Sequence, residues 1–84
     1  GNPITAWART QLGAVLAEEG KFAESQGELL EAERAFREAR SAPPSKHRSC
    51  LVYLATLYES WERAEPGKGH GAEAERWKAL VRPE

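Results

Sequence analysis

The feature that most constrains the fold is a set of apolar and small residues between positions 22 and 39 that recur every three or four residues. They are Phe22, Ser25, Leu29, Ala32, Phe36 and Ala39. Many of the intervening positions are charged: Glu24, Glu28, Glu31, Arg34 and Arg37. This spacing places the apolar residues on one side of an α-helix and the charges on the other. The segment is therefore predicted to be a helix with one buried and one solvated side.

A second helix is predicted over residues 3–19. Asn2 followed by Pro3 is typical of a helix start, because Asn accepts a hydrogen bond from an unpaired amide and Pro has no amide to lose. Gly20 is a natural end, since glycine adopts the left-handed conformation at little cost. The apolar residues that we expect to face the core in this segment are Ile4, Ala8, Leu12, Val15 and Leu16.

Two further helices are predicted after the proline pair Pro43-Pro44, which ends the helix that begins at residue 22. Ser45 is a candidate cap for a helix over residues 46–61. The expected buried side of that helix is Cys50, Leu51, Leu54, Leu57, Tyr58 and Trp61. Residues 65–71 are rich in glycine and predict a loop. A short helix over residues 72–81 follows, with an apolar stripe of Ala74, Trp77, Leu80 and Val81.

The predicted fold class is all-α. The thirteen acidic residues are all Glu, which suits helix interiors because Asp competes for backbone hydrogen bonds and Glu does not. Short connections favour antiparallel neighbours, so the four helices are expected to form two antiparallel helical hairpins. A chain of 84 residues is expected to make a single domain, residues 1–84, with a thin core.

Charge and composition narrow the choice of partners. Twelve basic and thirteen acidic residues give a formal net charge of -1, which supplies no general field to hold nucleic acid or an anionic membrane. No apolar run approaches the roughly 20 residues that span a bilayer, and the first residues lack the features of a signal peptide. The single cysteine, Cys50, is expected to be a buried small hydrophobe, which favours a reducing, cytoplasmic setting.

The two predicted hairpins repeat each other at a constant shift of 42 residues. The shift places Leu12 on Leu54, Gly13 on Ala55, Val15 on Leu57 and Leu16 on Tyr58. The tetratricopeptide repeat has Leu-Gly, a large residue, a turn glycine, an aromatic residue and a small residue in a fixed order. This chain has the same order in Leu12-Gly13, Leu16, Gly20, Phe22 and Ser25. It therefore resembles the tetratricopeptide repeat family in its long, 42-residue form.

The resemblance divides the chain into repeat one, about residues 3–40, a linker at 41–45, and repeat two, about residues 46–82. The stretches Leu57-Tyr58-Glu59-Ser60-Trp61 and Ala74-Glu75-Arg76-Trp77 resemble the C-terminal repeat of bacterial regulatory proteins. Repeat two departs from the pattern by an insertion within residues 62–71, and repeat one has Arg9 in place of the usual Trp. The resemblance implies that the hairpins stack as a short right-handed solenoid.

The same resemblance implies a scaffold or regulatory module for protein-protein interaction, with no enzymatic activity. In the family, the first helices of the hairpins line a concave groove that receives a protein or peptide segment. By alignment, the groove residues here would be Trp7, Thr10, Ala14, Ala17, Ser49, Val52, Thr56 and Glu59. The Lys and Asn set that clamps a peptide carboxylate in some members has no counterpart here. An apolar or weakly polar helix or extended peptide is therefore the expected ligand.

The number of repeats leaves two alternatives open. About three repeats are normally needed for stability, and this chain has two. The chain is therefore predicted to be the C-terminal capping end of a longer solenoid, with no ligand of its own, or a unit that self-associates as a homo-oligomer. Two interpretations of Trp7 also stay open. It either packs on a preceding repeat or lines the groove as an anchor for a partner.

Other sequence features resemble known binding or catalytic sites only weakly, and no cofactor is predicted. Pro66-Gly67-Lys68-Gly69-His70-Gly71 resembles a phosphate loop superficially, but Gly69 follows Lys68 where Ser or Thr is needed, and Glu62 stands at the position of the first glycine. Anion binding by the loop amides stays open.

Metal binding and catalysis are also weighed and set aside. The soft ligands His47, Cys50 and His70 are fewer than the four of a structural zinc site. Cys50 and His47 resemble a nucleophile and its base, but no third group is evident that would orient them.

Overall fold

A computed structural model describes residues 3–39 and 44–81, and within these ranges it contains four α-helices and no β-strand. The helices are α1 (Pro3–Glu18), α2 (Phe22–Glu38), α3 (Pro44–Ala64) and α4 (His70–Val81). The predicted all-α class is confirmed. The predicted cap at Asn2 and most of the predicted linker lie outside the described residues.

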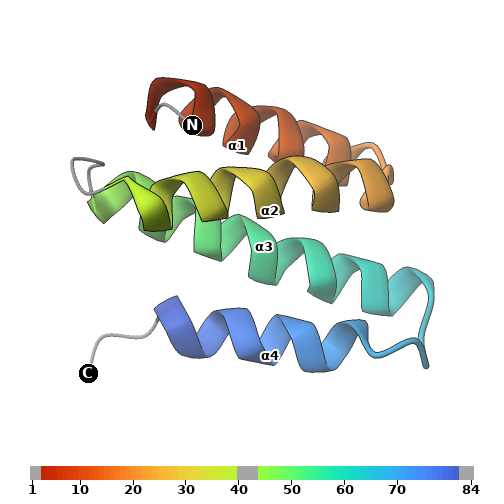
Figure 1. Cartoon of the computed structure of the whole chain (residues 1–84). Helices are drawn as coiled ribbons and strands as arrows, with labels where there is room; N and C mark the ends of the chain where they lie inside the picture. The colour runs from red at the N-terminus through yellow and green to blue at the C-terminus, as the bar shows by residue number, and fades with distance from the viewer. Residues whose placement is uncertain (1–2, 40–43, 82–84) are drawn as a thin grey trace.

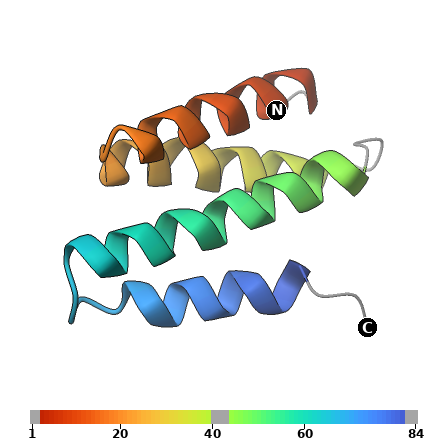
Figure 2. The same cartoon turned by 180° about the vertical axis from the view of Figure 1, so that it is seen from behind.

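The four helices follow one another in chain order, with α2 and α3 between the outer helices α1 and α4 (Figure 1). α2 passes in front of α1 and α3 in Figure 1 and behind both in Figure 2, so α1 and α3 lie in one layer. The backbone of α3 comes close to α1, α2 and α4, whereas α4 comes close only to α3 among the described helices. The result is a slab with principal dimensions of 38 × 30 × 15 Å.

The turn between α1 and α2 is closed by backbone hydrogen bonds around Gly20. Gly20 has a φ of 78°, which confirms the predicted left-handed helix end. The amide of Lys21 donates to the carbonyl of Leu16 at 2.9 Å, and the amide of Gly20 donates to the carbonyl of Ala17 at 3.0 Å. Together these bonds satisfy the last carbonyls of α1 in the Schellman arrangement, so α2 turns back directly along α1.

α1 and α2 approach each other closely at Gly13. A Cβ atom added to Gly13 would lie 2.5 Å from Cγ of Leu29, so only glycine fits without displacing that leucine. Beside this contact, the hydroxyl of Ser25 donates to the carbonyl of Gly13 at 2.7 Å. The small residue at this position is a serine, and its hydroxyl adds a buried hydrogen bond between the two helices.

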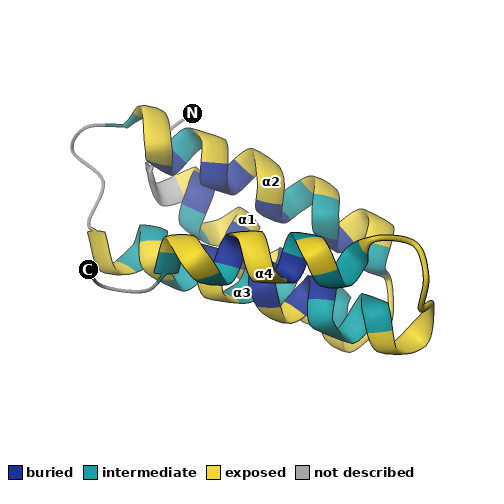
Figure 3. Cartoon of the chain, turned by 90° about the horizontal axis from the view of Figure 1, so that it is seen from below, coloured by how far each residue is buried: buried dark blue, intermediate teal, exposed yellow. Residues whose placement is uncertain are grey.

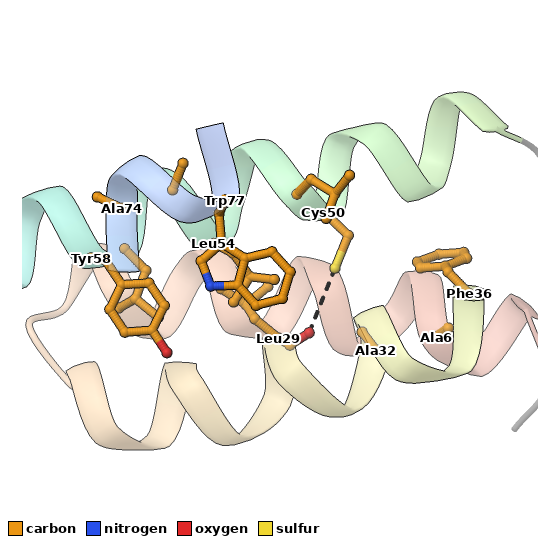
Figure 4. Close-up of a cluster of buried hydrophobic side chains, with 12 residues drawn as sticks. Ala6, Leu29, Ala32, Phe36, Cys50, Leu54, Tyr58, Ala74 and Trp77 are labelled. Carbon is orange, nitrogen blue, oxygen red and sulfur yellow. Dashed lines mark hydrogen bonds between the residues drawn. The ribbon is translucent and has the colours of Figure 1, made fainter. Parts of the chain in front are cut away.

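The core lies where α1, α2 and α4 meet α3 (Figure 4). Its fully buried members include Leu29 of α2 and Leu54, Leu57 and Cys50 of α3. From α4, Trp77 reaches over Leu54 and is also buried. The indole Nε1 of Trp77 has no hydrogen-bond partner among the described residues. The predicted buried sides of α2 and α3 are confirmed, with three exceptions: Phe22 and Trp61 are partly exposed, and Ala39 is partly exposed and lies just after the end of α2.

The predicted stripe on α1 is wrong. Leu12 and Val15 are 47% and 50% exposed, and Ala8 is exposed as well. The buried side of α1 is formed instead by Ala6, Thr10 and Gly13. These are small residues, and small residues are what the close approach of α2 requires. The apolar residues do share one side of α1, but that side is exposed and does not face the core.

The predicted bounds of the second hairpin also change. α3 begins at Pro44, so Ser45 lies inside the helix and is not its cap, and α3 continues to Ala64 rather than residue 61. α4 begins at His70 rather than residue 72. The connection is therefore Glu65–Gly69, and much of the predicted insertion is helical. In α4, Ala74 and Trp77 are buried as predicted, whereas Leu80 is 59% exposed. Buried and exposed segments alternate along α4 in Figure 3.

Candidate functional site

Four of the eight residues predicted to bind a partner lie on one side of α3. Ser49 and Val52 line a cleft of about 630 Å³ with Pro44, Ser45, Arg48 and Tyr53. Val52, Thr56 and Glu59 line a second cleft of about 320 Å³ with Ala55, Lys78 and Val81. The two clefts share Val52 and follow each other along α3. We call this continuous surface the α3 groove.

The α3 groove combines an exposed apolar centre with charges of both signs. Val52 is 43% exposed, and the residues that line the two clefts with it include no leucine or phenylalanine. Arg48 contributes a guanidinium group to the first cleft. In the second cleft Lys78 of α4 forms an ion pair with Glu59 of α3, and this hydrogen bond raises the pKa of Lys78. The pair joins the rim of α4 to α3.

The α1 half of the predicted set is less accessible. Thr10 is fully buried, and its hydroxyl donates to the carbonyl of Ala6 at 2.8 Å. A partner cannot reach Thr10, so this residue is corrected from the binding surface to the core. Ala14 and Ala17 are partly buried, and Ala17 packs against the core.

Trp7 faces α3. It packs against the core, and the ammonium group of Lys46 on α3 lies 4.2 Å from the centre of its indole ring. A cation at this distance over an indole face is attracted to it. Trp7 therefore packs within this chain, on the α3 side of α1, and the reading in which it covers a preceding repeat is not needed to explain it.

The soft metal ligands all have other contacts. His47 Nε2 lies 3.1 Å from Oε2 of Glu33 on α2, and the His70 ring stacks on Trp61 with 4.0 Å between ring centres. The Cys50 thiol donates to the carbonyl of Leu29 at 3.6 Å, and burial raises its pKa to about 11. Within the described ranges no three His, Cys, Asp or Glu residues are grouped as metal ligands. A neutral, buried thiol is also a poor nucleophile.

The glycine-rich loop binds an anion of its own chain. The amide of Gly71 donates to Oε1 of Glu62 at 3.0 Å, and the amide of Gly67 donates to Oε2 at 3.4 Å. The carboxylate thus occupies the position that an external anion would take. Glu62, which made the phosphate-loop reading fail at the sequence level, is the residue that organises the loop.

Sequence reasoning missed the residues that complete the α3 groove and one buried carboxylate, that of Glu33. Arg48, Tyr53 and Lys78 were not singled out for the groove, although Arg48 and Lys78 lie one residue before Ser49 and one after Trp77. Glu33 is only 7% exposed; its carboxylate lies within hydrogen-bond distance of His47 on α3 and forms an ion pair with Arg37 one turn away at 3.4 Å. The four-residue spacing of Glu33 and Arg37 is typical of a helical ion pair, but nothing in the sequence indicates that Glu33 is buried.

No family model, curated protein or solved structure matches the chain. Among the described helices none is long and apolar enough to cross a bilayer.

Proposed function

We propose that this chain is a protein-interaction module that binds a peptide or helix of a partner protein in the α3 groove. The observation that carries the proposal is the alignment of Ser49, Val52, Thr56 and Glu59 along two adjoining clefts. Grooves on helical scaffolds with an apolar centre and a charged rim suit amphipathic helices and extended peptides. The module has no enzymatic role and acts in the cytoplasm in this proposal.

The groove lining indicates what the partner segment carries. Val52 offers an exposed apolar contact at the junction of the clefts, so the partner supplies an apolar anchor there. Arg48 lies one helical turn before Val52, so an acidic residue of the partner one turn from its anchor pairs with it. The ligand class is therefore an amphipathic segment with an apolar anchor and a neighbouring acidic residue.

The wider frame of the proposal is a tetratricopeptide-like arrangement in which the two hairpins stack as a right-handed solenoid. The 42-residue shift and the docking of α3 against both helices of the first hairpin support it. In such an arrangement α1 and α3 lie in the same layer, and Trp7 and Lys46 lie where the two meet.

A peptide selection tests the proposal. A library of random peptides of about 12 residues, displayed on phage and selected on the immobilised chain, is expected to enrich apolar-acidic sequences. Val52→Glu is expected to weaken the enriched peptides at least about tenfold, roughly one lost apolar contact. The matched control is Leu30→Glu, because Leu30 is a similarly exposed apolar residue on α2, outside the groove. Peptides that bind wild type and Val52→Glu equally would contradict the groove assignment.

A second candidate function is a structural cap, and the exposed side of α4 favours it. Arg76 pairs with Glu73 at 3.4 Å and Lys78 pairs with Glu75 at 3.3 Å, so this edge is charged and solvated. Terminal repeats of solenoids carry a polar outer side of this kind. A cap predicts that the selection enriches no peptide that depends on Val52.

A further inference from the structure

The exposed side of α1 is the largest unexplained feature of the chain. Leu12 and Val15 are about half exposed, Ala8 lies on the same side, and Leu16 is partly exposed. Between Pro3 and Ala17 the helix has one charged residue, Arg9. A helix that is apolar on nearly all sides is normally covered on nearly all sides. Within the described residues, α2 and α3 cover only one side of α1.

The internal repeat shows what this exposed side is suited to do. A shift of 42 residues places Ala8 on Cys50, Leu12 on Leu54 and Val15 on Leu57. All three residues of α3 are fully buried in the core. On α3, these register positions form the side that packs against other helices. α1 therefore presents a helix-docking side that has no partner within the described chain.

A shallow cleft beside this side can receive part of a helix. It measures about 180 Å³ and runs between α1 and α2, lined by Thr5, Ala6, Arg9, Glu31, Arg34, Ala35 and Glu38. Four of its seven lining residues are charged, and Ala6 is only 1% exposed, so the cleft forms a charged border beside the apolar residues. We call the exposed apolar residues of α1, together with this cleft, the α1 face.

We propose that the α1 face binds the α1 face of a second copy of this chain, with the two α1 helices antiparallel about a twofold axis. Steric complementarity supports this occupant, because an axis near residue 10 places Leu12 opposite Ala8 of the second copy, large against small. The same axis places Val15 opposite the short side chain of Thr5. Both copies use the same surface in this isologous contact, so assembly stops at a dimer.

Charge complementarity also supports the antiparallel pairing. α1 has no acidic residue in its first turn and no basic residue in its last turn, where Glu18 is followed by Glu19. Antiparallel pairing brings these carboxylates near the amino-terminal end of the partner helix, whose backbone amides carry partial positive charge. The edge formed by α4 is charged, so a head-to-tail contact between α1 and α4 of two copies is disfavoured.

The size of the α1 face predicts a weak dimer. Sixteen residues at about 1.5 Å each make α1 about 24 Å long, and two packed helices are about 20 Å wide. Each copy therefore offers about 500 Å², or about 1,000 Å² in total, which is near the lower end for a specific interface. We expect a dissociation constant on the order of 10 µM.

Sedimentation equilibrium over about 1 µM to 1 mM chain tests the dimer. Wild type is expected to shift from monomer to dimer across this range, and Leu12→Glu or Val15→Glu is expected to weaken association at least about tenfold. Leu80→Glu is the matched control, because it places the same charge on an exposed leucine of α4. Circular dichroism shows that each variant is folded. A wild-type monomer at every concentration, or equal weakening by Leu80→Glu, would overturn the proposal.

A cysteine cross-link tests the orientation. In the variant Ala8→Cys, Leu12→Cys, antiparallel pairing brings position 8 of each copy next to position 12 of the other, so mild oxidation is expected to give a covalent dimer joined twice. Trypsin cleaves after Arg9 and separates the two positions, so mass spectrometry of the digested dimer shows which positions are joined. Disulfides from 8 to 12 are expected, and disulfides from 8 to 8 and from 12 to 12 would show a parallel pair and overturn the proposed orientation. Cys50 is buried and does not compete. If the variant dimerises in sedimentation but gives no covalent dimer under mild oxidation, the antiparallel pairing is wrong.

Discussion

The two edges of the slab, α1 and α4, each expose one side of a helix, but those sides differ in what surrounds their leucines. On α4, Leu80 lines a cleft whose other residues include the charged Glu33 and Arg37 of α2. On α1, Leu12 stands next to Val15 and Ala8, with few charges near them. Single exposed apolar residues are normal, whereas clustered ones mark contact surfaces. Leu80 is therefore more exposed than Leu12, but only Leu12 belongs to a cluster that indicates a contact surface.

The largest expected effect comes from removing the aromatic anchor of each edge. Trp77→Ala is expected to lower the free energy of unfolding by about 3–5 kcal/mol, because the indole is buried in the core. Trp7→Ala, at the other edge, is expected to cost about 1–2 kcal/mol, since Trp7 is only partly buried. Urea denaturation followed by circular dichroism measures both. Equal costs would mean that α1 is anchored as firmly as α4.

Trp77→Phe refines this comparison. Phenylalanine keeps most of the buried ring and removes the indole N–H that has no partner among the described residues. An unpaired buried donor costs about 1–3 kcal/mol, so Trp77→Phe is expected to cost much less than Trp77→Ala. A loss as large as that of alanine would show that the N–H has a partner in solution.

The core between the edges gives the next effect, through pH. The pKa of Cys50 is raised from 9.0 to about 11 by burial, so between pH 9 and 11 the unfolded thiol ionises while the folded thiol stays neutral. The free energy of unfolding therefore falls as pH rises through this window, by roughly 2 kcal/mol from this residue. Denaturation of wild type and Cys50→Ala at several pH values checks this. The expected result is a smaller slope in the variant.

A smaller effect is expected where α1 is joined to α2. Gly13→Ala is expected to destabilise the chain by about 1–2 kcal/mol, because the new methyl group meets Leu29 and outweighs the higher helix propensity of alanine. Gly27→Ala is the control: it lies in α2 with open space around it and is expected to stabilise by about 0.5–1 kcal/mol. Two changes of the same sign would show that α1 and α2 are not in close contact.

The smallest effect is expected at the loop that leads into α4. Glu62→Gln weakens two hydrogen bonds from loop amides to a carboxylate and is expected to cost about 1 kcal/mol. Glu65→Gln, in an exposed pair with Lys68, is expected to change stability much less, because solvent screens an exposed ion pair. Thermal denaturation of the two variants decides whether Glu62 organises the loop.

The helices could be predicted from the sequence, but only partly which side of each is covered. In α2, charges alternate with apolar residues, so periodicity identifies both the helix and its buried side. In α1 charges are almost absent, so periodicity selected Leu12 and Val15, while the close packing of Gly13 on Leu29 decides the covered side. Such a contact joins residues sixteen positions apart and leaves no periodic signal.

The candidate site shows the same division. Alignment with the repeat family places Ser49, Val52, Thr56 and Glu59 on one side of a helix. They line two adjoining clefts in the structure, because a regular helix preserves that relation. Thr10 was misplaced, because the same alignment does not show how deeply α1 is packed. Lys78 was not predicted for the groove because it comes from another helix and reaches Glu59 only through the tertiary fold.

The position of α3 has a consequence for the order in which the chain opens. Among the described helices the backbone of α4 comes close only to α3, so α4 is expected to detach before α1, α2 and α3 separate, and its amides are expected to exchange with solvent first. The second cleft includes Lys78 and Val81 of α4 and is lost in that open state. A ligand that spans both helices would therefore slow exchange in α4, and its binding would be coupled to the closing of the last helix.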